Sequence, residues 1–147
     1  IMIKPRFIKE VRQYNQTIEK FEREVISESI CGGETISVVK NMMKNVVEKK
    51  HGTAHNIYSE DISLAGKTGT CQTEYWKESG LYISSFVGYF PADKPKYSCA
   101  VVIHKPNKNK GYYGNIVAAP VFKEIAQKIN SVTPQKENYS FSEIEIN

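Results

Sequence analysis

The sequence predicts an α+β fold in which an antiparallel sheet of at least three strands packs against helices. Two stretches repeat apolar residues at helical spacing, two others are rich in β-branched and aromatic residues, and a strong turn signal separates these last two. The 147 residues are 40% apolar and 24% charged, which is the composition of an ordinary globular protein. The net charge of +4 is small and dispersed, so nucleic acid is not predicted as a partner.

The N-terminal region predicts short extended segments. Residues 6–11 and 17–21 flank a polar turn at 13–16, and Val25-Ile26 follows as a third short segment. This region therefore predicts two short extended segments around a polar turn, ahead of the first helix.

The first helix is predicted after the break at Gly32-Gly33. Thr35 is expected to cap its start and Gly52 to stop it. Its apolar face consists of Ile36, Val39, Met43, Val46 and Val47.

Three strands are predicted in the second half, at residues 64–72, 81–90 and 97–103. The segment 91–95 contains two prolines and an aspartate, which is typical of a turn. The last two strands are therefore expected to form an antiparallel hairpin.

The C-terminal part predicts a helix over residues 116–129, with Pro120 in its first turn or at a kink. Residues 1–133 are expected to form one domain portion, and the polar residues 134–147 a flexible tail. No stretch has the apolar length of a membrane span, and no signal peptide is recognised at the start.

Neither a metal nor another cofactor is predicted. The three cysteines are far apart and odd in number, so they predict buried or partly buried thiols. The histidines have no ligand spacing and predict surface or loop positions. These residues are Cys31, Cys71, Cys99, His51, His55 and His104.

The segment Ala65-Gly66-Lys67-Thr68-Gly69-Thr70 is the main candidate site. A lysine between hydroxyl residues and glycines forms a compact cationic, hydrogen-bonding patch. A phosphate-binding loop would need a glycine where Asp61 stands, so a nucleotide site is disfavoured. A glycine-weakened strand with a solvent-facing lysine remains the structural alternative.

Four short sequence blocks, including this segment, occur along the chain in the order typical of a known family. The region resembles the C-terminal part of the transpeptidase domain of class B penicillin-binding proteins, over about residues 2 to 130. The blocks are Gly52-Thr53-Ala54, residues 65–70 with Gln72, residues 85–92 and residues 118–122.

The resemblance implies a partial transpeptidase-like fold without its helical subdomain, and a serine acyl-enzyme that cross-links peptidoglycan stem peptides and binds β-lactams. It implies that Lys67, Thr68, Gly69 and Thr70 bind substrate, and that the backbone N–H of Thr70 contributes to the oxyanion hole. The nucleophile is expected outside this chain, so the chain alone is expected to be inactive.

Two similar-looking motifs are judged decoys. Ser37-Val38-Val39-Lys40 has the S-x-x-K form, but it lies within the helix that the family places just before Gly52. Tyr113-Gly114-Asn115 resembles the family's second motif, but it follows Lys67 instead of preceding it. We expect it to be a loop and the start of a helix.

The resemblance implies a parent protein anchored in the cytoplasmic membrane with this domain on the outer face, serving division or elongation machinery. Two alternatives remain open. One is a non-catalytic sensor or interaction module that self-associates through exposed sheet edges. The other is a relative of serine β-lactamases. An upstream reading frame with the missing motifs would favour the transpeptidase.

Overall fold

The computed structural model describes residues 1–74, 76 and 80–132, and the chain divides into two compact units, Ile1–Val39 and Lys40–Asn147. Within the first unit, β1 (Met2–Ile3) pairs antiparallel with β4 (Val25–Ser27).

The two extended segments predicted around the N-terminal turn are present with different boundaries, and the structure pairs them as a hairpin. Strand β2 (Glu10–Gln13) pairs with β3 (Gln16–Lys20). Tyr14 and Asn15 connect them with φ of 48° and 65°, the positive values that a two-residue hairpin turn requires. The first strand therefore starts later than predicted, and the turn is shorter. No residue of the first unit is buried.

Helix α1 (Gly33–Glu48) carries the first predicted helical segment. The prediction that Thr35 caps it is wrong. The backbone N–H of Ile36 already donates to the carbonyl of Gly32 at 3.2 Å, so the helix starts at the glycine pair and Thr35 lies inside its first turn. The apolar face is buried only at Val47, and Ile36 and Val39 are exposed.

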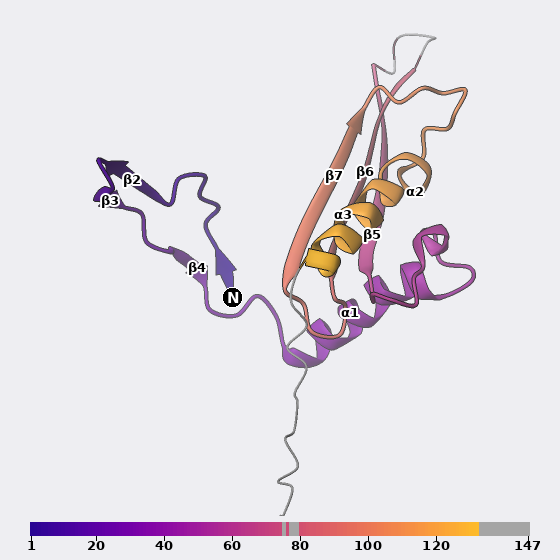
Figure 1. Cartoon of the computed structure of the whole chain (residues 1–147). Coiled ribbons are helices and arrows are strands. Elements are labelled where there is room, and N and C mark those ends of the chain that lie inside the picture. The colour runs from indigo at the N-terminus through magenta and orange to yellow at the C-terminus, as the bar shows by residue number, and fades with distance from the viewer. Residues whose placement is uncertain (75, 77–79, 133–147) are drawn as a thin grey trace, which may run out of the picture. The chain divides into compact units, whose positions relative to one another are not determined.

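The second unit contains the predicted three-stranded antiparallel sheet. Its order is β5 (Ala65–Thr73), β6 (Leu81–Phe90) and β7 (Tyr97–His104), within one residue of the predicted bounds (Figure 1). A short 3₁₀ helix, η1 (His55–Ile57), precedes the sheet. The α+β prediction is therefore confirmed.

The C-terminal helix is divided into α2 (Gly114–Val117) and α3 (Ala119–Val132). Pro120 lies in the first turn of α3, as predicted. Proline has no N–H to donate to the carbonyl four residues earlier and disfavours helical geometry in the residue before it, which accounts for the break. Residues 134–147 lie outside the described residues, so the tail and the boundary at 133 stay predictions.

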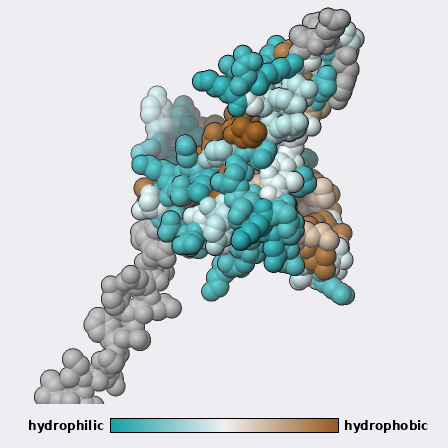
Figure 2. All heavy atoms as spheres, turned by 90° about the vertical axis from the view of Figure 1, so that its right-hand side faces the viewer, coloured by the Kyte–Doolittle hydropathy of each residue, from teal (hydrophilic) through white to brown (hydrophobic). Residues whose placement is uncertain are grey.

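The core of the second unit lies between α3 and one face of the sheet (Figure 1). The rings of Phe86 and Phe122 are 4.8 Å apart, and Phe90 meets Phe122 edge-on at 5.6 Å. Elsewhere, hydrophilic side chains dominate the surface in the view of Figure 2, and apolar ones gather in small patches.

Candidate active site

The four residues of the predicted site lie consecutively on β5, an outer strand of the described sheet that pairs with β6 alone. Successive side chains of a strand point to opposite faces. Thr68 and Thr70 therefore share the face of their register partners Phe86 and Ser84, which is the helix-covered face. Lys67 lies on the opposite face. The Lys67 ammonium and the two threonine hydroxyls therefore extend from opposite faces of β5. They share the outer edge of the described sheet, and they do not lie on one surface.

Lys67 is exposed and its Nζ donates to the carbonyl of Thr68 at 2.9 Å. Its side chain also lines a shallow groove of about 340 Å³. The groove places the Gly52-Thr53 block beside the lysine, although the two are separated in sequence. Its lining residues are Met42, Asn45, Val46, His51, Gly52, Thr53 and Lys67.

Thr70 is exposed, and its hydroxyl oxygen accepts a hydrogen bond from the backbone N–H of Gly114 at 3.1 Å. Ser84 holds the loop that precedes Gly114, because its hydroxyl donates to the carbonyl of Tyr112. Asn56 donates from Nδ2 to the carbonyl of Asn115 at 2.7 Å. The start of α2 is therefore fastened next to the candidate site.

A tyrosine cluster borders this segment. Tyr82 stacks on Tyr112 at 4.1 Å between ring centroids, and Lys108 Nζ lies 5.3 Å from the centre of the Tyr82 ring. Tyr112 donates its hydroxyl to that of Tyr113 at 3.1 Å. This hydrogen bond raises the pKa of Tyr113 above its ordinary value. The cluster makes this end of the sheet aromatic and cationic.

Comparison with known proteins identifies the family to which this chain belongs. The family model for the penicillin-binding protein transpeptidase domain matches residues 1–127. The chain belongs to the penicillin-binding protein transpeptidase domain family. The family predicted from the four sequence blocks is confirmed.

Curated relatives of this transpeptidase-domain chain are named as D,D-transpeptidases. It is 33% identical over 110 residues to peptidoglycan D,D-transpeptidase FtsI of Buchnera aphidicola subsp. Baizongia pistaciae, covering 74% of the chain and 19% of that protein. It is 32% identical over 127 residues to probable peptidoglycan D,D-transpeptidase PenA of Neisseria flavescens, covering 79% and 30%. The chain thus spans less than a third of the length of these relatives.

Solved structures agree with this assignment. The transpeptidase domain of the FtsI4 D,D-transpeptidase from Legionella pneumophila matches with a TM-score of 0.59 and 31% identity, over 69% of this chain and 37% of that one. Penicillin-binding protein 2B of Streptococcus pneumoniae matches with a TM-score of 0.64 over 82% of this chain and 19% of that one. At 18% identity, the second match supports the fold alone.

The two decoy motifs lie where the sequence predicts. Ser37 is on α1, and its hydroxyl donates to the carbonyl of Gly33 at 3.0 Å, the local bond of an ordinary helical serine. Tyr113 precedes α2, which begins at Gly114. The non-catalytic interpretation of Ser37 and Lys40 stays a prediction.

The cysteine and histidine predictions need two corrections. Cys31 and Cys99 are partly buried as predicted, whereas Cys71 is exposed, because it extends from β5 on the same face as Lys67. His55 is partly buried, with Nδ1 2.9 Å from the carbonyl oxygen of Val47. His51 and His104 are exposed.

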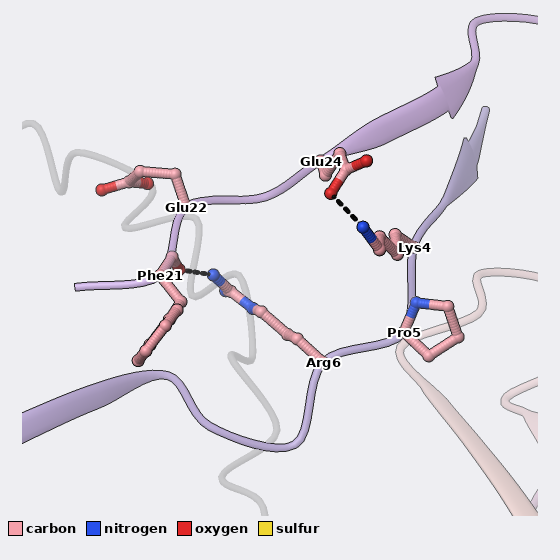
Figure 3. A pocket seen from close by; sticks show the side chains of 6 residues that line it. All are labelled: Lys4, Pro5, Arg6, Phe21, Glu22 and Glu24. Carbon is pink, nitrogen blue, oxygen red and sulfur yellow. Dashed lines mark hydrogen bonds and ion pairs between the residues drawn. The ribbon is translucent and has the colours of Figure 1, made fainter.

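The first unit has a hollow of its own, of about 230 Å³. Lys4 pairs with Glu24 at 2.9 Å, and Arg6 donates to the carbonyl of Phe21 (Figure 3). Glu22 pairs with Lys20 at 2.8 Å. Because these charged groups have partners within the unit, the hollow offers no evident ligand site.

Within the part of the chain that the structure describes, no group of histidine, cysteine and acidic residues could hold a metal ion. Over the same residues, no helix is both long and apolar enough to span a membrane.

Proposed function

We propose that this chain supplies one wall of the active site of a D,D-transpeptidase that cross-links peptidoglycan stem peptides through a serine acyl-enzyme and binds penicillin. The observation that carries the proposal is Lys67, exposed on an outer strand beside the groove of the Gly52-Thr53 block, in a chain of the transpeptidase family. The nucleophile belongs to a part of the parent protein outside this chain.

The proposed reaction is an acyl transfer in two steps. The serine hydroxyl attacks the carbonyl carbon of the penultimate D-alanine. The bond to the terminal D-alanine breaks, and this residue leaves as an amine that carries the serine proton. The amine of a second stem peptide then attacks the ester carbon, forms the cross-link and returns a proton to the serine.

The residues of this chain would bind and orient the acyl donor. The ammonium of Lys67 and the hydroxyls of Thr68 and Thr70 suit the terminal carboxylate, since charge-assisted hydrogen bonds are the strong ones. The backbone N–H of Thr70 is proposed to donate to the oxyanion. The unpaired side of β5 would pair with the extended peptide, as in β-strand addition.

Labelling with a fluorescent penicillin tests the proposal in the full-length parent. Replacing Lys67 by methionine keeps the length of the side chain and removes its charge. The Lys67→Met variant is expected to be acylated about tenfold to a hundredfold more slowly, the loss of one charge-assisted hydrogen bond. Lys94→Met, an exposed lysine in the β6–β7 turn, is the matched control and is expected to label at the parental rate.

The same assay includes this chain alone, which is expected to form no covalent adduct. A labelled band would contradict the assignment of Ser37 as a decoy, and Ser37→Ala would show whether that serine carries the label. Equal labelling of Lys67→Met and the parent would overturn the carboxylate-binding role.

The location and macromolecular partners of the parent are part of the proposal. The family resemblance implies a parent anchored in the membrane and acting in division or elongation, with this domain on the outer face, and relatives named peptidoglycan D,D-transpeptidases support a role in peptidoglycan synthesis. For the chain alone, β5 and β7 each pair on one side in the described sheet, which favours self-association through these edges.

A further inference from the structure

We propose that residues 112–115 form a backbone clamp that positions the Thr70 hydroxyl as a donor to the carboxylate of the acyl donor, and that Ser84 and Asn56 are the positioning residues that hold this clamp. The inference rests on the proposed function, because it assumes that Thr70 contacts that carboxylate. It adds residues that lie on other elements and do not touch the substrate themselves.

The contact between Thr70 and Gly114 sets the direction of the hydroxyl. A threonine hydroxyl has one proton to donate and two lone pairs that accept. One lone pair is occupied by the Gly114 N–H at 3.1 Å, so the hydroxyl proton must point away from Gly114. Because Thr70 is exposed, this proton is available to a ligand at the edge of β5.

Gly114 can make this contact because it has no side chain. A Cβ at this position would lie 2.3 Å from the carbonyl oxygen of Ser85 and 2.7 Å from that of Gly69. Both are backbone atoms, which cannot rotate away. The start of α2 is therefore pressed directly onto the two strands, close enough for its amide to reach Thr70.

Ser84 holds one end of the clamp. It is fully buried, is the register partner of Thr70 on β6, and donates its hydroxyl to the carbonyl of Tyr112. A buried hydroxyl is costly unless it is hydrogen-bonded, and here the bond fixes the chain two residues before Gly114. Hydroxyls from two paired strand positions thus fix the same short segment.

Asn56 holds the other end. Its Nδ2 donates to the carbonyl of Asn115 at 2.7 Å from the segment that follows the Gly52-Thr53-Ala54 block. The clamp is consequently tied both to the sheet through Ser84 and to the segment beside the Lys67 groove through Asn56. Ser84 and Asn56 therefore hold the short segment whose Gly114 N–H contacts the Thr70 hydroxyl.

The test compares two acyl donors on the full-length parent. One is an N-acyl-D-alanyl thioester whose leaving group ends in a carboxylate, and the other carries a carboxamide there; thiol release gives kcat/KM for each. Ser84→Ala and Asn56→Ala are expected to lower the preference for the carboxylate about threefold to tenfold, the effect of one misdirected hydrogen bond. Asn109→Ala, an exposed asparagine in the β7–α2 loop, is the matched control.

A merely structural role would lower kcat/KM for both donors equally and leave their ratio unchanged, which would overturn the inference. Asn56 is exposed, so its variant stays informative if Ser84→Ala fails to fold. If Lys67→Met abolishes the preference but Thr70→Val does not, the clamp is wrong and the proposed function stands. If the parent shows no thiol release, or no preference that Lys67→Met reduces, the proposed function fails together with the inference.

Discussion

The two faces of the β5-β6-β7 sheet are made by alternate residues of the same strands, yet they differ in burial and in role. On the helix-covered face, Phe86 and Phe90 are fully buried and pack against Phe122 of α3. On the opposite face, Val87 and Val102 each remain 49% exposed. This second face, which also carries Lys67 and Gly69, is called the open face below.

The difference separates the aromatic core from Lys67, whereas Thr68 and Thr70 of the candidate site lie on the helix-covered face. Burial of large aromatic side chains supplies the main favourable free energy of folding, and it lies on the covered face. Lys67, one of the proposed ligands of the substrate carboxylate, extends from the open face and is exposed. A strand can serve both purposes because its side chains alternate.

The largest expected effect is at Phe86. Phe86→Ala removes a fully buried ring from the contact with Phe122 and leaves a cavity, so the free energy of unfolding should fall by about 3 to 5 kcal/mol. The neighbouring variant Val87→Ala on the open face should cost less than about 1 kcal/mol, because much of that side chain already contacts water. Urea unfolding of the purified chain measures both.

Similar losses in these two variants would mean that the open face is as tightly packed as the covered one. The comparison between the faces would then be wrong. A change in the urea m-value, instead of the midpoint alone, would show that a variant alters the compactness of the denatured or native state.

The two glycines of the Lys67 motif give a finer comparison. A Cβ on Gly66, on the covered face, would lie 2.6 Å from the Phe86 ring and 2.7 Å from the carbonyl oxygen of Val87. Gly66→Ala should therefore destabilise the chain by about 1 to 3 kcal/mol through overpacking. On the open face, a Cβ on Gly69 would meet only the Ser85 side chain, whose hydroxyl can rotate away.

Gly69→Ala should consequently cost less than Gly66→Ala in thermal unfolding. The reverse order would contradict the view that the covered face sets the packing limit. It would also indicate that Gly69 is needed for stability.

Much of this sheet could be predicted because its local signals agree. Residues 81–90 and 97–103 combine β-branched and aromatic side chains with a proline-containing turn, so both strands were placed within one residue. The Thr35 prediction was wrong because this good capping residue stands two positions after Gly33, where the helix already begins. Local propensity alone does not show which of two competing starts will form.

The site was predicted less completely. Lys67 and its neighbours could be found from the motif, whereas the clamp could not, because Asn56, Ser84 and Gly114 are far apart in sequence. One signal was available: Ser84 is a polar residue at an alternating position otherwise occupied by aromatic and glycine residues of β6. A hydroxyl on the buried face of a strand predicts a specific hydrogen-bond partner.

The smallest expected effect is at the surface ion pair that joins α1 to the β6–β7 turn. Lys44 Nζ lies 2.7 Å from Asp93 Oδ1, and this hydrogen bond, with a second one from Ser63, lowers the pKa of Asp93 below its ordinary value. A carboxyl whose pKa is lower in the folded state stabilises the fold above its unfolded pKa of about 4. That contribution is lost as the pH falls through the folded pKa.

Asp93→Asn should therefore lower the Tm slightly near neutral pH, and the difference from the parent should vanish in acid, where the Asp93 carboxyl of the parent is itself neutral. Because Asp93 is exposed, concentrated salt should also shrink the difference. Asp61→Asn, an exposed carboxylate before β5, is the matched control. A difference that persisted unchanged in acid would show that Asp93 acts through packing instead of charge, and would extend the well-packed region beyond the helix-covered face.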